Sequence, residues 1–220
     1  MLHRRALLAL PLLAAPAAAQ PAFLPDGQAL SLLRAGGLNL YLRHAITDRT
    51  QVDTGRRGDR AGQRNLSEAG REQARALGRA FRALGIPVAE VLTSEVFRAA
   101  DTAELAFGQA RVERDLIADD YTPGSASEDA RAVSRRLAQP VGQIAHGGNP
   151  PLRESVRNET AGGNRVMVGH IVPLGMILGR GLAQAEFPEG SMGLFRPRGA
   201  DWEFLGFVTA EQLIAAAGSR

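Results

Sequence analysis

Two histidines and two arginines are the side chains of this sequence best suited to chemistry. His44 and His170 each follow a short apolar run that is typical of a buried strand. Arg43 adjoins the first histidine, and Arg98 follows a third such run near the start of a predicted helix. Ligands of open α/β sheets bind at the carboxyl ends of the strands, so all four side chains are expected at one binding edge.

A phosphoryl group is the reactant that fits this set. The guanidinium fork binds phosphate oxygens, and neutral imidazole is a competent nucleophile. The alternative for each residue is a solvated position at a loop edge, which is common at strand ends. His146 lies in a loop rich in Gly and Pro and is interpreted as a surface residue. The scattered histidines, without an HExxH motif or a carboxylate cluster, predict no metal site.

Alternating strand and helix patterns must position these residues. Strands are predicted at residues 38–43, 88–93, 165–169, 192–197 and 202–208, and helices at 67–84, 95–107, 127–137, 173–182 and 211–217. Residues 21–37 are interpreted as a Pro-containing lead, 45–64 as a long Arg-rich loop, and 141–163 stay unassigned. The alternation predicts an α/β fold, a three-layer sandwich with a largely parallel central sheet.

The first nineteen residues have the pattern of a signal peptide. A basic start at Arg4 and Arg5 precedes an apolar stretch and three consecutive alanines that fit a cleavage site before Gln20. The apolar stretch is short for a bilayer span, which takes about 20 residues, although an uncleaved anchor is the alternative. We expect a signal peptide at 1–19, one domain at 20–220, and a secreted, periplasmic protein without a membrane span. The choice between general and twin-arginine export stays open.

Composition removes several classes of function. The absence of cysteine excludes disulfides, thiolate metal sites and cysteine nucleophiles. All 26 basic residues are Arg, so Schiff-base chemistry and phosphate-binding P-loop lysines are excluded as well. With a formal net charge of only +3 and 5% aromatic residues, no nucleic-acid partner is expected.

Four motifs in order resemble those of the histidine phosphatase superfamily, which has the phosphoglycerate mutase-like fold. Residues 41–47 (YLRHAIT) are similar to its Arg-His-Gly-x-Thr signature, and 66–74 (LSEAGREQA) to its Leu-Ser/Thr-x-x-Gly-x-x-Gln-Ala helix start. Residues 93–103 (TSEVFRAADTA) are similar to its Ser-x-x-x-Arg-Ala-x-x-Thr-Ala segment, and 168–170 to the strand end that carries its second histidine.

The resemblance implies a role for each matching residue. His44 would attack phosphorus and become phosphohistidine, while Arg43, Arg98 and His170 would bind the phosphoryl oxygens and stabilise the transition state. Thr47 would add a hydroxyl to the pocket. Water would then hydrolyse the phosphoenzyme, and the family needs no metal or other cofactor.

Three positions depart from the family pattern or leave it open. Ala45 stands where the family has Gly. The general acid is expected at Asp119, with Asp120 as its alternative and a turn-forming role for the pair equally open. Ile171 stands where the acid phosphatase and phytase branch has Asp, so this chain is unlike that branch.

The resulting prediction is an exported, metal-independent phosphatase. Its substrate would be a small phosphomonoester, for which an envelope sugar phosphate is one candidate. The alternative is a phospholigand-binding protein of the same fold with little or no turnover. A phosphomutase is disfavoured, because an exported protein would rarely meet the glycolytic intermediates that such enzymes use. The sequence predicts no oligomeric state.

Overall fold

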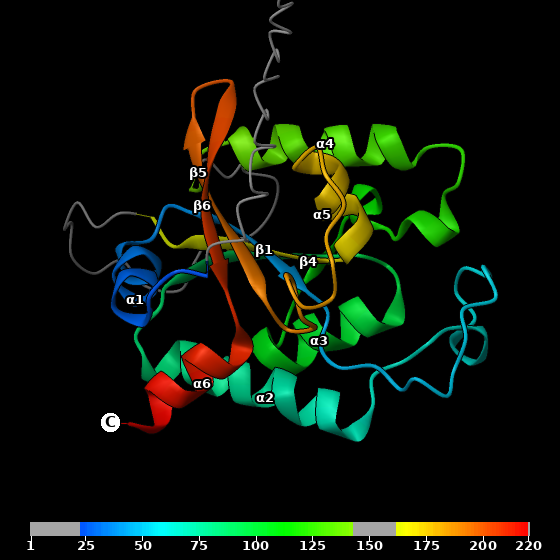
Figure 1. The fold of residues 1–220 in the computed structure, drawn as a ribbon, viewed down its shortest axis with the longest axis horizontal. Coiled ribbons are helices and arrows are strands. Elements are labelled where there is room, and N and C mark those ends of the chain that lie inside the picture. Colours follow the sequence, from blue (N-terminus) through cyan, green and yellow to red (C-terminus); the bar gives the residue numbers. More distant parts are fainter. Residues whose placement is uncertain (1–22, 143–161, 220) are drawn as a thin grey trace, which may run out of the picture.

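A six-stranded sheet runs through the centre of the molecule (Figure 1). The computed structural model describes residues 23–142 and 162–219. The strands are β1 (Asn39–Arg43), β2 (Val88–Thr93), β3 (Arg111–Val112), β4 (Asn164–Gly169), β5 (Met192–Arg198) and β6 (Asp201–Val208). Their order is β3-β2-β4-β1-β5-β6. Strands β3, β2, β4 and β1 run parallel to one another, β5 runs antiparallel to β1, and β6 pairs antiparallel with β5. The predicted, largely parallel sheet is confirmed.

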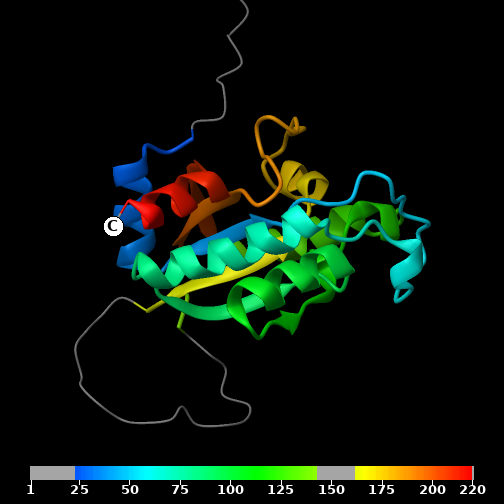
Figure 2. The ribbon, with the colours of Figure 1, turned by 90° about the horizontal axis from the view of Figure 1, so that it is seen from below.

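Helices cover both faces of this sheet and complete the predicted three layers (Figure 2). They are α1 (Asp26–Ala35), α2 (Glu68–Ala83), α3 (Phe97–Phe107), α4 (Ala126–Ala138), α5 (Ile171–Ile177) and α6 (Ala210–Gly218). Helices α1, α2, α3 and α6 lie on one face, and α4 and α5 lie on the other.

The alternation within β1 shows why this strand is central. Leu40 and Leu42 pack in the apolar cluster under α1, α2 and α6, while Tyr41 packs in the cluster under α4. All five residues of the strand are buried. A strand buried on both faces carries apolar side chains in both directions, which is the pattern that parallel sheets require. Arg43, the last residue of β1, therefore reaches the sheet edge from inside the core.

The prediction of an irregular N-terminal lead is wrong for residues 26–35, because these residues form helix α1. The helix follows Pro25, carries Asp26 in its first turn and Arg34 in its last, and buries Ala29 and Leu33. Gly36 ends it with a φ of 72°. These are ordinary start and stop signals, and the prolines before the helix concealed them.

Two other helix boundaries differ from expectation. Helix α5 covers Ile171–Ile177 instead of 173–182, because Gly179 turns the chain with a φ of 69°. Pro173 fits inside its first turn, where no backbone N–H is needed. Helix α3 begins at Phe97 instead of residue 95, because the Ser94 hydroxyl accepts the Val96 amide ahead of the helix.

Some predictions fall outside the described residues. The signal peptide at 1–19, His3, His146 and most of the unassigned 141–163 stretch lie there, so they stay predictions. Within residues 23–142 and 162–219, no helix is long and apolar enough to cross a membrane.

Candidate active site

His44 lies directly after β1 and is held on three sides by backbone. Its amide donates to Gly169 O at 3.1 Å, and its carbonyl accepts the Gly190 amide at 3.0 Å. The ring Nδ1 lies 2.9 Å from Ala45 O. Since a carbonyl only accepts, Nδ1 carries the ring proton and Nε2 keeps its lone pair. The position of Ala45 O therefore selects the tautomer with an unprotonated Nε2, which a nucleophile needs.

The charge state of His44 follows from its surroundings. The side chain is buried, and this burial, followed by the positive charge of Arg98, holds its pKa well below the ordinary value of 6.5. The ring is therefore neutral at neutral pH, with Nε2 free of a proton.

His170 lies at the end of β4, with its ring centroid 5.4 Å from that of His44. The two strands are adjacent and parallel, which explains the proximity of residues 126 positions apart. The His170 Nε2 lies 3.0 Å from the Ser94 hydroxyl, which itself accepts the Val96 amide. When the Ser94 hydroxyl donates its proton to Nε2, the ring proton of neutral His170 lies on Nδ1. Burial, then Arg98, lowers the pKa of His170 as well.

Arg43 and Arg98 are buried guanidiniums that each have one carboxylate partner. Arg98 Nη1 donates to Asp53 Oδ1 at 2.9 Å, and Arg43 Nη2 lies 3.9 Å from Glu189 Oε1. Arg43 Nη1 also donates to Phe187 O at 2.5 Å. Burial lowers the pKa of Arg43 to about 10, with Glu189 opposing the shift, so the group stays charged at neutral pH.

Three buried donors of this site have no protein partner. Among the described residues, Arg43 Nε, Arg98 Nε and His170 Nδ1 are buried and make no hydrogen bond. Buried donors without a partner cost free energy and are rare in native structures, which makes a group of them at one place a sign of a ligand. A ligand with several acceptor oxygens would satisfy all three.

The helix-start motif holds the loop after His44. Ser67 caps α2 by accepting the Gly70 amide at 3.0 Å. A Cβ on Gly70 would lie 1.8 Å from Ile46 O, so only glycine permits this approach. Gln73 accepts the Ile46 amide at 3.1 Å and donates to Glu189 O at 3.2 Å. The helix-start residues that carry the resemblance therefore hold the loop that follows His44 in place.

The segment around α3 supports the same loop from the other side. Thr102 Oγ1 accepts the Ala45 amide at 2.9 Å and donates to Arg98 O at 2.7 Å. Ala45, where the family pattern has Gly, is buried in a small apolar cluster with Leu66 and Ala74, so its methyl group has a place in the packing.

Thr47 and Glu189 form a contact that the sequence did not predict. The buried Thr47 hydroxyl donates to Glu189 Oε1 at 2.7 Å, which commits its proton to this carboxylate. The structure therefore gives Thr47 a supporting contact through Glu189, and its direct contact with phosphate stays a prediction. Glu189 lies in the segment between α5 and β5, and no local pattern marked it.

The carboxylate pair after β3 is divided by its environment. Asp119 is half-buried, whereas Asp120 is exposed. Burial, then the neighbouring Asp120, raises the pKa of Asp119. The positive charge of Arg98 acts in the opposite direction and lowers the pKa of the same carboxyl.

Asp53 connects the long loop to the site. It accepts Arg98, the Tyr121 hydroxyl at 2.6 Å and the Arg64 amide at 3.0 Å. Burial would raise its pKa, but these three contacts prevail and lower it. Asp53 and Tyr121 are further site residues that the sequence did not reveal, because the contact spans 68 positions.

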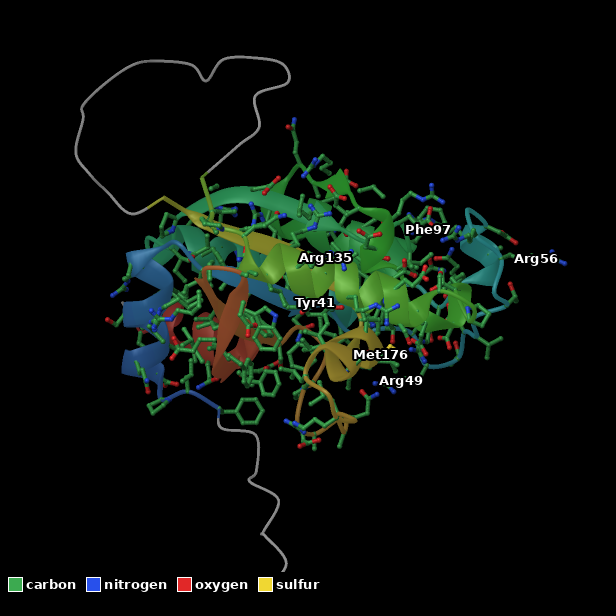
Figure 3. The ribbon with its side chains drawn as sticks, turned by 90° about the horizontal axis from the view of Figure 1, so that it is seen from above. Tyr41, Arg49, Arg56, Phe97, Arg135 and Met176 are labelled. Atoms are coloured by element: carbon green, nitrogen blue, oxygen red, sulfur yellow. The ribbon has the colours of Figure 1, made fainter. Side chains whose placement is uncertain are left out.

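The arginines of the 45–64 loop have different surroundings. Figure 3 shows Arg56 at the outer tip of this loop, far from Tyr41 in the core. Arg57 pairs with Glu95 and Arg60 with Asp101, so neither faces the histidines unpaired. Arg64 differs, because its Nε is buried without a partner among the described residues and its charge lowers the pKa of both histidines. Arg49 pairs with Glu189 instead, so of the loop arginines Arg64 has the buried donor that is left without a partner in the described chain.

No metal-binding group is present in the described part of the chain, where no three His, Asp or Glu side chains gather in a way that would hold an ion.

Sequence comparison identifies one family. The profile of the histidine phosphatase superfamily (branch 1) matches residues 40–120, which include His44, Arg98 and the Asp119–Asp120 pair. This match confirms the resemblance drawn from the motifs. His170 lies beyond the matched residues and is placed by the fold. Among curated proteins, no sequence match is found.

Solved structures share the fold. A phosphoserine phosphatase from Entamoeba histolytica in complex with phosphoserine aligns with a TM-score of 0.53 at 12% identity, covering 80% of this chain and 98% of its own. A mycobacterial glucosyl-3-phosphoglycerate phosphatase aligns with a TM-score of 0.51 at 16% identity, and the alignment covers 79% of this chain and 99% of that protein. The protein histidine phosphatase SixA complexed with tungstate aligns with a TM-score of 0.50 at 12% identity. The alignment covers 80% of this chain and 99% of SixA. At these identities the likeness establishes the phosphoglycerate mutase-like fold.

Proposed function

We propose that this chain, whose residues 40–120 match the profile of the histidine phosphatase superfamily, is a phosphatase that acts through a phosphohistidine on His44 and needs no metal. The observation that carries the proposal is the group of buried nitrogens at one sheet edge. Arg43 Nε, Arg98 Nε and His170 Nδ1 lack partners within the described residues, and His44 Nε2 carries a lone pair beside them. Three donors and one nucleophile are what a phosphoryl group requires.

The first step forms the phosphoenzyme. His44 Nε2 attacks phosphorus, a nitrogen–phosphorus bond forms, and the bond between phosphorus and the alcohol oxygen breaks. Arg43, Arg98 and His170 donate to the three non-bridging oxygens as charge develops. Asp119 supplies the proton to the leaving oxygen, a role that its raised pKa favours.

The second step restores the enzyme. Water attacks phosphorus while Asp119, now a carboxylate, accepts a proton from it. The nitrogen–phosphorus bond breaks, inorganic phosphate leaves, and His44 returns to its neutral form. Atoms and charge balance over the two steps without a further reactant.

The substrate is proposed as a small phosphomonoester. The structural neighbours are named for phosphoserine, glucosyl-3-phosphoglycerate and phosphohistidine chemistry, so one fold serves small and protein-borne phosphates. An envelope sugar phosphate is the candidate that an exported enzyme would meet.

Export is a separate proposal and rests on residues 1–19. The full chain, expressed in a Gram-negative host, should appear in the periplasmic fraction with Gln20 as its first residue. Recovery in the cytosol with an intact N-terminus would contradict it.

Hydrolysis of an activated aryl phosphate in the presence of EDTA tests the mechanism. The chain from residue 20 should retain activity in EDTA, and His44→Ala should abolish it. Trapping at alkaline pH, where phosphohistidine persists, should place one phosphoryl group on the peptide that contains His44. Arg79→Ala, an exchange on the exposed face of α2, is the control and should behave as wild type.

The alternative is a phospholigand-binding protein. Binding of inorganic phosphate without His44-dependent turnover of the aryl phosphate would favour it, because that substrate has a good leaving group and hardly needs the general acid.

A further inference from the structure

Glu189 is a buried carboxylate beside the phosphate-binding residues, and the proposed mechanism does not use it. Its side chain is only 6% exposed. It lies in the segment that connects α5 to β5, which reaches the sheet edge from the side opposite to Asp119 and α3. A negative charge at this place opposes the binding of a phosphate dianion, so its presence needs an explanation.

The contacts of Glu189 join three residues around the nucleophile. Oε1 accepts the Thr47 hydroxyl at 2.7 Å and lies 3.9 Å from Arg43 Nη2. Oε2 accepts Arg49 Nη2 at 3.1 Å. Buried charges are stable only when they are paired and hydrogen-bonded, and here both oxygens have partners.

The backbone around Glu189 fastens the same pair of residues. Phe187 O accepts Arg43 Nη1, Ser191 O accepts the Arg43 amide at 2.9 Å, and the Gly190 amide donates to His44 O. Gly190 has a φ of 85°, and a Cβ there would lie 2.8 Å from the Gln73 side chain. The segment 187–191 is therefore held closely against Arg43 and His44, and the carboxylate has a fixed position.

Arg98, like Arg43, has a carboxylate beside its guanidinium group. Asp53 occupies Arg98 Nη1, Glu189 flanks Arg43 Nη2, and in both arginines Nε is buried without a partner in the described chain. In both arginines the buried Nε–H is left as a donor for the ligand.

We propose that Glu189 is a positioning residue for Arg43 whose negative charge also limits how tightly the site holds phosphate. This rests on the proposed phosphatase function, since a hydrolase must release inorganic phosphate in every cycle. The carboxylate aligns Arg43 Nε toward the phosphoryl group and weakens binding of the product dianion.

Glu189→Gln separates the charge from the shape. The amide keeps an oxygen for the Thr47 hydroxyl but removes the negative charge, so the Kd for inorganic phosphate should fall by about fivefold or more. Titration calorimetry with phosphate measures this without turnover, so the result does not depend on whether the protein is a phosphatase. With an aryl phosphate, KM and the product-inhibition constant should fall together, and kcat should not rise.

Two further variants and a control complete the test. Glu189→Ala removes the alignment of Arg43 as well, so kcat should fall further than in Glu189→Gln. Glu189→Asp keeps the charge and should keep the wild-type phosphate affinity. It provides the comparison if Glu189→Ala does not fold. Glu186→Gln removes an acid three positions earlier that contacts Arg180 and the Ala183 amide instead of the site, and it should bind phosphate as wild type does.

An unchanged or weaker phosphate affinity in Glu189→Gln would overturn the proposed effect of charge. Equal kcat values in Glu189→Gln and Glu189→Ala would overturn the positioning of Arg43. Phosphate binding that responds to Glu189→Gln in a protein without turnover would instead contradict the phosphatase and leave the role of Glu189 standing.

Discussion

The neighbouring carboxylates Asp119 and Asp120 differ in how deeply they are buried. Asp119 is half-buried in the short helix η3 (Asp119–Tyr121), and burial, then Asp120, raises its pKa. Asp120 is exposed. A general acid must hold its proton near the working pH, so the raised pKa favours Asp119.

Asp119→Asn should therefore show a dependence on the leaving group. For an alkyl phosphate such as glycerol phosphate, kcat should fall by roughly 10²-fold or more, because the alcohol needs the proton. For an aryl phosphate with a good leaving group, the loss should be much smaller. Steady-state kinetics with both substrates measures the difference.

Asp120→Asn is the matched control for this prediction. It should leave both rates near wild type and move the alkaline limb of the pH–rate profile to lower pH, because the charge that raises the pKa of Asp119 is gone. Equal losses with both substrates in Asp119→Asn would show that the residue is not the acid.

The predictability of single residues depends on what makes them functional. His44, Arg43, Arg98 and His170 could be predicted because each follows a recognisable strand, and strand ends meet at one edge. The position of Glu189 could not be predicted, because its contact with Thr47 joins residues 142 positions apart. Asp53 escaped prediction for the same reason.

At the scale of elements, α2 and the nucleophile loop are joined by a close approach. Gly70 in α2 faces Ile46 O, and the adjacent Gln73 binds the amide of the same Ile46. The helix therefore fixes the loop only if no side chain separates the two backbones.

Gly70→Ala should destabilise the fold and disturb the site together. A Cβ 1.8 Å from Ile46 O cannot be accommodated without backbone movement, so the free energy of unfolding should fall by about 1–3 kcal/mol. Chemical denaturation measures the loss, and aryl phosphatase activity at a temperature where the variant is folded measures the effect on His44.

Gly27→Ala is the control for this helix effect. Gly27 lies in α1 with nothing within 4 Å of the added Cβ, so the exchange should be neutral or stabilising by up to about 1 kcal/mol. If both exchanges cost the same, the close approach to Ile46 would not be the cause.

Helices with a long apolar periodicity could be predicted from the sequence, whereas a helix next to prolines and glycines could not. Helix α2 has sixteen residues, a Ser67 cap and a terminal glycine, and its prediction is confirmed. Helix α1 was missed because Pro21 and Pro25 suggested a loop, although Ala29 and Leu33 are spaced as one buried helical face. Its burial comes from packing against the same cluster as α6, which no local pattern shows.

For the molecule as a whole, the site is a source of pH sensitivity. His44 and His170 are both buried, and burial first, then Arg98, lowers the pKa of each. In the unfolded chain both residues take up protons below their ordinary pKa, near 6.5, while in the folded chain they do not. The unfolded state therefore binds more protons as the pH falls, and the free energy of unfolding must decrease.

The size and window of this effect are predictable. Below pH about 6.5 the two histidines should together lower the free energy of unfolding by about 2.7 kcal/mol per pH unit, until the folded state also takes up protons. Asp53 acts in a lower window, because its pKa is lowered by folding and its contribution is present above about pH 4 and lost below it. Between pH 8 and pH 5 the histidines therefore act, and Asp119, whose pKa folding raises, acts with the opposite sign. In urea denaturation across this range, His44→Gln should reduce the slope by about 1.4 kcal/mol per pH unit, whereas an unchanged slope would show that folding does not lower the pKa of His44.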